Sequence, residues 1–276
     1  MTKKILLIND FPGYGKVAIS AMTPVLVRRG YEVFSLPTMI VSNTLNYGRF
    51  ASIDTTAYMK EAVQVWKNLG FCFDAVSTGF IANDEQADFI AQFCREQSDA
   101  GALIFVDPIM ADNGKLYNSV TERRIEAMKA IVSAADYTVP NITEACFLTG
   151  IEYREDGYSK KELFDMARAL HYQGAKSVII TSAKIKNTDG SFSRAVIGYD
   201  NAGDKCFSVG FDEIPIKING SGDTFSAVMM AEILNGSELE NAVKKAVNGV
   251  SGLILENLDI AKEYNGLPIE KNIEIL

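Results

Sequence analysis

The sequence is poor in the residues from which zinc centres and disulfide scaffolds are built. It contains one His in 276 residues, and its four Cys residues are far apart and form no C-x-x-C motif. Neither a zinc site nor a disulfide framework is therefore expected, and a reducing compartment such as the cytoplasm fits best. His171 ends a helical pattern just before Gly174, where a cation suits the helix C-terminus better than a Ser-His-Asp triad.

Positive charge and long apolar runs are also scarce. There are 27 Lys and Arg residues against 35 Asp and Glu residues, which gives a net charge of −8. Such a protein lacks the basic surface that nucleic acids and acidic membranes require. No run approaches 18 apolar residues, and the N-terminal run at residues 5–8 is too short for a signal peptide. We therefore expect neither nucleic acid nor a membrane as a partner.

The sequence does contain a regular alternation of short apolar runs and segments with helical periodicity. The runs predict buried strands at residues 4–9, 32–36, 74–78, 103–107, 137–139 and 177–181. The clearest helical stripe covers residues 239–254. This alternation indicates an α/β fold with a mostly parallel sheet and helices on both faces. Because no linker or repeat interrupts it, we expect one domain over residues 1–276.

Two stretches depart from this alternation. Residues 191–199 and 205–211 alternate as strands do and flank an Asp-Asn-Ala-Gly turn, which predicts a β-hairpin. Residues 38–56 are polar, aromatic and rich in Asn, Ser and Gly. This segment is long for a simple connection, and long connections are often functional.

The first glycine motif follows the first predicted strand. Gly13 and Gly15 fit the pattern G-x-G-x-x-G/A, with Ala18 in the last position, which is typical of dinucleotide-binding sites. That pattern also requires an acidic residue at the end of the second strand, whereas Glu32 stands where that strand begins. An NAD-dependent oxidoreductase that uses Gly13 and Gly15 is therefore an alternative function.

The second glycine motif, from Asn219 through Gly220, Ser221 and Gly222 to Asp223, precedes a predicted helix that runs to about Leu234. Backbone N–H groups at a helix N-terminus, together with the helix dipole, favour negative charge. A carboxylate in the first helical turn can accept a proton from an attacking hydroxyl. Phosphoryl transfer requires both features, although a Gly-Ser turn before an acidic helix start explains the same residues.

A third candidate is the acidic pair Asp107 and Glu144. Asp107 ends a predicted strand, and Glu144 follows Asn141 by three residues, which predicts a capping box at the start of a helix. If the two residues lie on neighbouring strand ends, they could also help to hold Mg²⁺, directly or through water, because this ion prefers few carboxylates together with phosphate oxygens and water.

The order of these motifs resembles the ribokinase-like superfamily and, within it, the pyridoxal kinase branch. The resemblance covers nearly the whole chain. It rests on Ser-Asn at 42–43 with Tyr-Gly at 47–48, Asp-Pro-x-Met at 107–110, Pro-Asn-x-x-Glu at 140–144 and Gly-Ser-Gly-Asp at 220–223. It implies a three-layer ribokinase-like sandwich, a homodimer, and a kinase that uses ATP and Mg²⁺ to phosphorylate the 5′-hydroxyl of a vitamin B6 vitamer.

The resemblance also implies roles for individual residues. Asp223 would be the general base, and the amides of Gly220, Ser221 and Gly222 would form the anion hole. Asp107 and Glu144 would lie at the metal. The Mg-ATP region would comprise Asp107, Asn141, Glu144, Thr181, Ser182 and Asn219. The substrate pocket would include Asp10, Thr38, Ser42, Tyr47 and Phe80, with Phe80 against the flat ring. Residues 110–117 would form a flap over the reacting groups.

Two positions depart from the pattern of the pyridoxal kinase branch. Asp10 stands where many of these kinases have Ser, and Leu45 stands where a Thr is common. A carboxylate at position 10 could accept a hydrogen bond from ring substituents or from a protonated ring nitrogen. The preferred vitamer therefore stays open, and so does a hydroxymethylpyrimidine kinase of the same fold.

Overall fold

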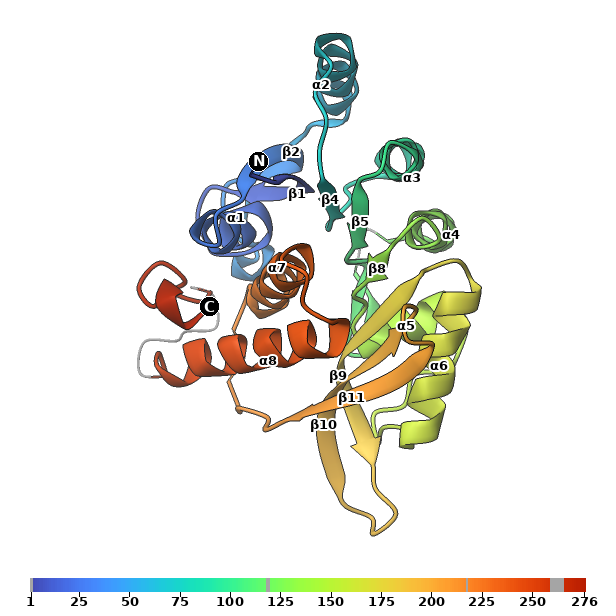
Figure 1. The fold of residues 1–276 in the computed structure, drawn as a ribbon. Helices are drawn as coiled ribbons and strands as arrows, with labels where there is room; N and C mark the ends of the chain where they lie inside the picture. Colours follow the sequence, from blue (N-terminus) through green and yellow to red (C-terminus); the bar gives the residue numbers. More distant parts are fainter. Residues whose placement is uncertain (1, 118–119, 217, 259–265) are drawn as a thin grey trace. The chain divides into compact units, whose positions relative to one another are not determined.

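The computed structural model describes residues 2–117, 120–216, 218–258 and 266–276. The chain folds into two compact units, which Figure 1 shows as a ribbon. Unit 1 combines the N-terminal part up to Gln86 with Ile214–Leu276, and unit 2 is Ala87–Glu213. Both units contain sheet and helix, so the predicted α/β class is confirmed. The expectation of a single kinase domain over residues 1–276 stays a prediction.

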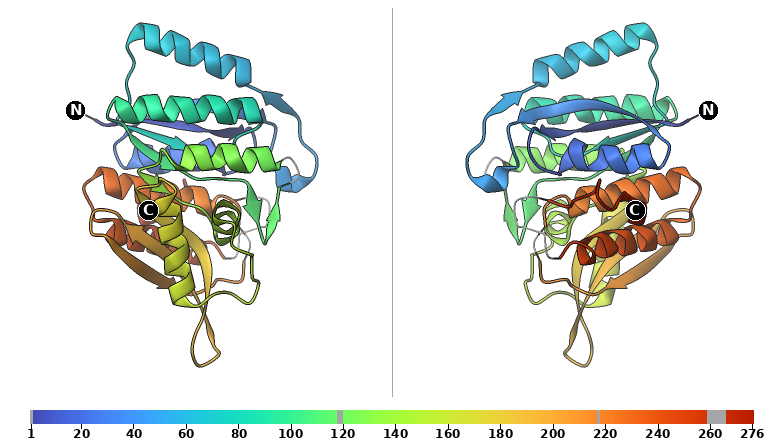
Figure 2. Two further views of the ribbon diagram at one scale, coloured as in Figure 1. Left: turned by 90° about the vertical axis from the view of Figure 1, so that its right-hand side faces the viewer. Right: turned by 90° about the vertical axis from the view of Figure 1, so that its left-hand side faces the viewer.

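Unit 1 is built on four strands in the order β4-β1-β2-β3. β1 (Lys4–Pro12) pairs in parallel with β2 (Glu32–Val41) and with β4 (Ala75–Thr78), and β3 (Ser52–Asp54) pairs antiparallel to β2. α7 (Ser221–Leu234) and α8 (Leu239–Leu255) lie side by side (Figures 1 and 2). The other helices are α1 (Ala18–Arg28), α2 (Thr56–Leu69), and the short 3₁₀ helices η1 (Leu45–Tyr47) and η2 (Ile273–Ile275).

Unit 2 is built on five strands in the order β11-β10-β9-β8-β5. β5 (Leu103–Val106), β8 (Tyr137–Thr138) and β9 (Ser177–Lys186) are parallel, and β10 (Phe192–Asp200) and β11 (Lys205–Phe211) continue as antiparallel strands. A small separate hairpin consists of β6 (Ala111–Asp112) and β7 (Lys115–Leu116). The helices are most of α3 (Asp84–Asp99), α4 (Glu122–Val132), α5 (Ile142–Thr149) and α6 (Lys160–Tyr172).

The structure confirms the six predicted strands and the predicted hairpin, now β10 and β11. The prediction that residues 38–56 form one long connection is wrong in part, because β2 continues to Val41 and β3 occupies Ser52–Asp54. The pairing of β1 with β2 shifts at Thr38 and Met39, and such a bulge interrupts the regular alternation of apolar and polar residues by which a strand is predicted from sequence. Within the described ranges, no helix has both the length and the apolar character that a bilayer crossing requires.

The interior of unit 1 contains a charged cluster around Glu232 on α7. The Glu232 side chain is 4% exposed and forms ion pairs with Arg29 and Lys245. The Ser237 hydroxyl donates a third hydrogen bond over 2.8 Å. Burial by itself raises the pKa of Glu232, but the hydrogen bonds from Lys245, Arg29 and Ser237 outweigh it and lower the pKa to about 2. The cluster therefore stabilises the folded state only while Glu232 is ionised.

This cluster predicts a specific loss of stability in acid. Because the folded pKa of about 2 lies below the ordinary value of 4.5, the stabilisation is complete above pH 4.5 and is lost as the pH falls towards 2. We expect Glu232→Gln to lower the free energy of unfolding at pH 7 by on the order of 3 kcal/mol. Urea unfolding between pH 2 and 7 measures this, and the variant should show a shallower pH dependence than the wild type.

A matched control is Glu126→Gln, which removes an ion pair to Lys129 from the exposed face of α4. It should change the free energy of unfolding by less than about 0.5 kcal/mol. Equal pH dependences in wild type and Glu232→Gln would contradict the assignment.

Candidate active site

The first part of the candidate site lies at the end of β1 in unit 1. The pairing of β1 with β2 shifts at Asp10, so that Thr38 and Met39 lie opposite this single residue. Such a β-bulge redirects side chains and is common beside active sites. Asp10 is half-buried.

Asn9, which is 3% exposed, fixes the loops around Asp10. Its Oδ1 accepts hydrogen bonds from the backbone N–H groups of Asp10 (3.0 Å) and Phe80 (2.7 Å). The Thr38 hydroxyl donates to the carbonyl oxygen of Phe80 over 2.8 Å. A Cβ at Gly79 would lie 2.2 Å from the Asn9 amide nitrogen, so only glycine fits there. The structure thus groups three predicted substrate residues, Asp10, Thr38 and Phe80, around a buried Asn9.

The other two predicted substrate residues, Ser42 and Tyr47, lie on a second loop of unit 1. The Ser42 Oγ accepts a hydrogen bond from the N–H of Ala51 over 2.9 Å, which closes the loop. The Tyr47 ring packs edge-on against Tyr14, with 6.2 Å between ring centroids. These contacts place Ser42 and Tyr47 with the loop that follows β1.

Close packing of these two loops explains the first glycine motif. The N–H of Gly13 donates to the carbonyl oxygen of Val41 over 2.7 Å. Gly15 has a φ of 125°, and a Cβ there would lie 2.4 Å from the Thr44 side chain. The contact with residues 41–44 therefore requires glycine at position 15 and leaves little room for a side chain at position 13, without any dinucleotide.

The second glycine motif forms the N-terminus of α7, as predicted. Gly220 is the N-cap, has a φ of 83° and provides no side-chain cap. A Cβ at Gly220 would lie 1.9 Å from the carbonyl oxygen of Lys16, so the motif packs tightly against the segment that leads into α1. Gly222 is exposed, and a Cβ there would meet no atom within 4 Å. A side chain is therefore excluded at position 220 but would fit at position 222.

Asp223 lies in the first turn of α7 and is half-buried. Burial raises the pKa of Asp223 above its ordinary value, while the N–H of Ala18 donates to the carboxylate and opposes this rise. Ala18 has a φ of 51°, an unusual conformation for a residue with a Cβ, and such strain is concentrated at functional sites.

Asp10 and Asp223 interact electrostatically within unit 1. Burial, followed by repulsion from Asp223, raises the pKa of Asp10 to about 7, despite the opposing effect of a backbone hydrogen bond. A buried carboxyl group whose pKa is raised further by a second carboxylate is typical of functional sites.

In unit 2, the predicted capping box of α5 is confirmed. The Asn141 side chain accepts from the N–H of Glu144 over 3.0 Å, and the Glu144 Oε2 accepts from the N–H of Asn141 over 2.8 Å. Glu144 is 2% exposed. Burial raises the pKa of Glu144 to about 8, and N–H donors from Asn141, Met110 and Ala111 oppose the rise.

The described residues contain no group of three or more His, Cys, Asp or Glu side chains that could enclose a metal ion. Asp107 is half-buried directly after β5. One accessible carboxylate suits Mg²⁺, because the ion usually retains waters and phosphate oxygens. Glu144 is buried and its oxygens already accept backbone hydrogen bonds. The residues therefore fit Mg²⁺ that arrives with a nucleotide, with Glu144 acting through water.

Thr181 and Ser182 lie at a β-bulge within β9. The register with β10 shifts so that both residues lie opposite Val196, and Ser182 has a φ of 57°. The N–H of Thr181 donates to the carbonyl oxygen of Pro140 over 2.9 Å, and Thr181 forms an isolated bridge with Asn141. Two predicted nucleotide residues, Asn141 and Thr181, are therefore neighbours.

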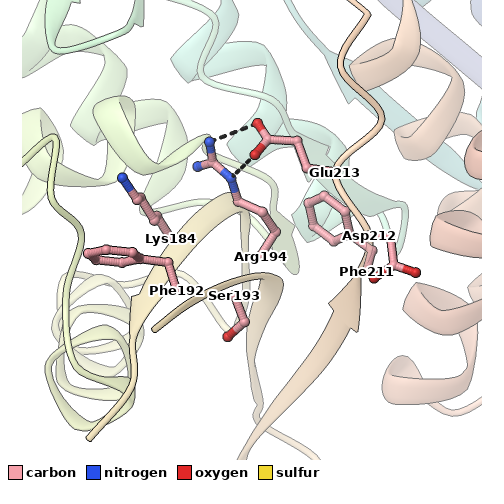
Figure 3. Close-up of a pocket in the computed structure, with 7 residues that line it drawn as sticks. All are labelled: Lys184, Phe192, Ser193, Arg194, Phe211, Asp212 and Glu213. Atoms are coloured by element: carbon pink, nitrogen blue, oxygen red, sulfur yellow. Dashed lines mark hydrogen bonds and ion pairs between the residues drawn. The ribbon is translucent and has the colours of Figure 1, made fainter. Parts of the chain in front are cut away.

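A pocket of about 260 Å³ opens in unit 2 near the end of the antiparallel strands (Figure 3). Arg194 forms two hydrogen bonds to Glu213, over 2.8 and 3.0 Å, along one side of it. The sequence did not predict this pocket, because its residues come from three separate strands and share no motif. Its lining consists of Lys184, Phe192, Ser193, Arg194, Phe211, Asp212 and Glu213.

Comparison with known proteins identifies the family of the chain. Residues 22–267 match the phosphomethylpyrimidine kinase family. Among characterised relatives, pyridoxal kinase PdxY of Granulibacter bethesdensis is 27% identical, and the match covers 91% of this chain and 88% of the relative. Hydroxymethylpyrimidine/phosphomethylpyrimidine kinase of Haemophilus influenzae is also 27% identical, with 95% and 94% covered.

Solved structures agree with this assignment. A candidate phosphomethylpyrimidine kinase from Bacteroides thetaiotaomicron, crystallised with pyridoxal, is 29% identical and has a TM-score of 0.91, with 98% of this chain and 94% of that chain covered. Pyridoxal kinase from Lactobacillus plantarum, at 24% identity and a TM-score of 0.86, shares the fold over 99% of this chain and 96% of that chain. The predicted ribokinase-like fold is thereby confirmed, and the chain belongs to the phosphomethylpyrimidine kinase family and is a phosphotransferase with an alcohol group as acceptor.

Proposed function

We propose that this kinase phosphorylates the 5′-hydroxyl of a vitamin B6 vitamer with ATP. The observation that carries the proposal is the half-buried Asp223 in the first turn of α7, directly after the backbone amides of Gly220, Ser221 and Gly222. A base and a cluster of N–H donors at one helix N-terminus are the two elements that this reaction requires.

Asp223 accepts the proton of the substrate hydroxyl as that oxygen attacks the γ-phosphorus. A new oxygen–phosphorus bond forms, and the bond between the γ-phosphorus and the bridging oxygen breaks. The electron pair of the broken bond stays on ADP. The backbone N–H of Ala18 lowers the pKa of Asp223 and so favours the ionised carboxylate that accepts a proton.

The backbone amides of residues 220–222 bind the phosphoryl group in transit. Charge is spread over its equatorial oxygens in the transition state, and N–H donors at a helix N-terminus stabilise this charge. The left-handed Gly220 directs the chain into this position, since a side chain there would collide with the carbonyl oxygen of Lys16.

Within unit 2, we assign nucleotide contacts to Thr181 and Ser182. The bulge at Thr181 and Ser182 interrupts the regular pairing of β9 with β10 at these two residues. Lys184, two residues further along the strand, lines the pocket of Figure 3 together with Phe211. The aromatic and polar side chains that line this pocket suit the adenosine part of the nucleotide.

Asp107 is the residue that we expect to contact Mg²⁺, with Glu144 acting through water. Bound Mg²⁺ would neutralise the charge of the ATP phosphates. Asn141 would orient this region, because its side-chain nitrogen donates to the carbonyl oxygen of Ala111 over 2.8 Å.

Two relatives indicate which acceptors to expect. The Bacteroides thetaiotaomicron structure with pyridoxal favours a B6 vitamer, and the Haemophilus influenzae relative favours hydroxymethylpyrimidine as the second candidate. An ATP-coupled assay over pyridoxal, pyridoxamine, pyridoxine and hydroxymethylpyrimidine tests both. We expect the highest kcat/KM for one of the three vitamers, and a preference for hydroxymethylpyrimidine would replace the first candidate with the second. The homodimer and the cytoplasmic location stay predictions.

Asp10 provides a separate prediction about the substrate pocket. We expect Asp10→Asn to lower kcat/KM for the preferred vitamer by about tenfold or more, because the carboxylate can no longer accept a charged hydrogen bond from the ring or its substituents. The folded pKa of about 7 lies above the ordinary 3.8, so ionised Asp10 destabilises the wild type as the pH rises through this window. The variant should therefore be more stable at pH 8, by on the order of 3 kcal/mol.

Steady-state kinetics and urea unfolding at pH 5 and pH 8 measure both effects. The gain in stability should shrink at pH 5, where wild-type Asp10 is largely protonated. A variant that is equally active and no more stable would show that Asp10 lies outside the substrate pocket.

A further inference from the structure

The hairpin of β6 and β7 packs against the N-terminus of α5. It follows Asp107 closely in the sequence, and it turns at Asn113 and Gly114, both of which have a positive φ. Apart from its own short ladder, the hairpin is closed at its base by the N–H of Tyr117, which donates to the carbonyl oxygen of Met110 over 2.9 Å. A two-stranded ladder this short is not stable alone.

Glu144 stabilises the hairpin by hydrogen bonds to its backbone. Its Oε1 accepts hydrogen bonds from the N–H groups of Met110 (3.1 Å) and Ala111 (3.5 Å), where the hairpin begins. Its Oε2 completes the capping box with Asn141. One buried carboxylate therefore joins the first turn of α5 to the first strand of the hairpin.

Two neighbours of Glu144 strengthen the same connection. The Thr143 Oγ1 accepts from the N–H of Gly114 over 3.1 Å, at the tip of the hairpin. The Asn141 side chain donates to the carbonyl oxygen of Ala111. Gly114 also packs against Tyr153, whose ring would lie 2.5 Å from a Cβ at that position.

We propose that Glu144 is a positioning residue that fixes the β6–β7 hairpin onto α5, with Thr143 as a second anchor at the tip. If the proposed function is correct, on which only this last step rests, the placement of this hairpin, which follows Asp107 in the chain, governs turnover.

The capping box of α6 is a natural reference for this proposal. There, the Glu162 Oε2 accepts from the N–H of Ser159 over 2.8 Å, and Glu162 forms an ion pair with Arg154 over 2.6 Å. The Glu162 side chain is 47% exposed and is part of a capping box of the same type. Glu162→Gln therefore makes the same substitution in a capping box that does not touch the hairpin.

The test is hydrogen–deuterium exchange of the full-length protein, followed by mass spectrometry on peptides that cover residues 107–117. Glu144→Gln replaces one acceptor oxygen by a donor group, so at least one backbone N–H loses its partner. Thr143→Val removes the Gly114 anchor and leaves both sides of the capping box in place. We expect both variants to raise hairpin exchange about tenfold or more, and Glu162→Gln to leave it within about twofold.

Equal exchange in the wild type and in folded Glu144→Gln and Thr143→Val would overturn the proposal, and so would an equal increase in Glu162→Gln. If Glu144→Gln does not fold, hairpin exchange in Thr143→Val alone tests the proposal. In the kinase assay, we expect Glu144→Gln to lower kcat about tenfold with the KM of the acceptor little changed. A wild type that phosphorylates none of the acceptors would refute the proposed function, while the exchange result would still test the hairpin.

Discussion

Replacing Asp223 by Asn is expected to lower kcat by about 10³-fold, within the range that a general base contributes. The substitution removes the proton acceptor but keeps the backbone amides of residues 220–222 in place. Binding of a non-hydrolysable ATP analogue, measured by calorimetry, should therefore stay within about threefold of the wild type.

A suitable control is Glu240→Gln, which removes a carboxylate from the first turn of α8, where Glu240 pairs with Lys244. It has the same position relative to a helix dipole but no place in the proposed site, so kcat should stay within about twofold. If Asp223→Asn retains wild-type turnover, another group must accept the proton.

Gly220→Ala should have the second largest effect. The added Cβ would lie 1.9 Å from the carbonyl oxygen of Lys16, and the φ of 83° is unfavourable for alanine. Because backbone atoms must move, we expect the free energy of unfolding to fall by about 2–4 kcal/mol. The same movement displaces the segment that leads to Ala18, so kcat should fall about 100-fold.

Gly222→Ala is the matched control for this prediction. Its Cβ would enter open space, and alanine favours helix, so the free energy of unfolding should be equal or up to about 1 kcal/mol higher. Urea unfolding of both variants provides the comparison. Similar losses in the two variants would show that the clash with Lys16 does not control this region.

The sequence predicted the parts of the candidate site that depend on local chemistry. The N-terminus of α7 before Asp223 and the capping box of Asn141 and Glu144 each follow from a few adjacent residues, and both are confirmed as structure. The roles assigned to Asp223 and Glu144 in catalysis stay predictions.

Features that depend on distant segments could not be predicted. The strain at Ala18, the clash site at Lys16 and the pocket beside Arg194 all arise from contacts between residues far apart in the chain. Likewise, the Gly13 and Gly15 motif matches a dinucleotide pattern in the sequence, but the glycine at position 15 is required by its contact with Thr44 in the neighbouring loop.

Unit 1 is assembled from two segments that flank unit 2, and this has a consequence for biosynthesis. Asp10 leaves the ribosome early, whereas Asp223 emerges only after residues 87–213 have been translated. At about 5–20 residues per second, the 213 residues from Asp10 to Asp223 take roughly 11–43 s. When the last residue of the continuous middle segment has been translated, the nascent N-terminal strands still lack α7 and α8, which are synthesised later. We therefore expect the middle segment to acquire protease resistance on the ribosome before the ends of the polypeptide do.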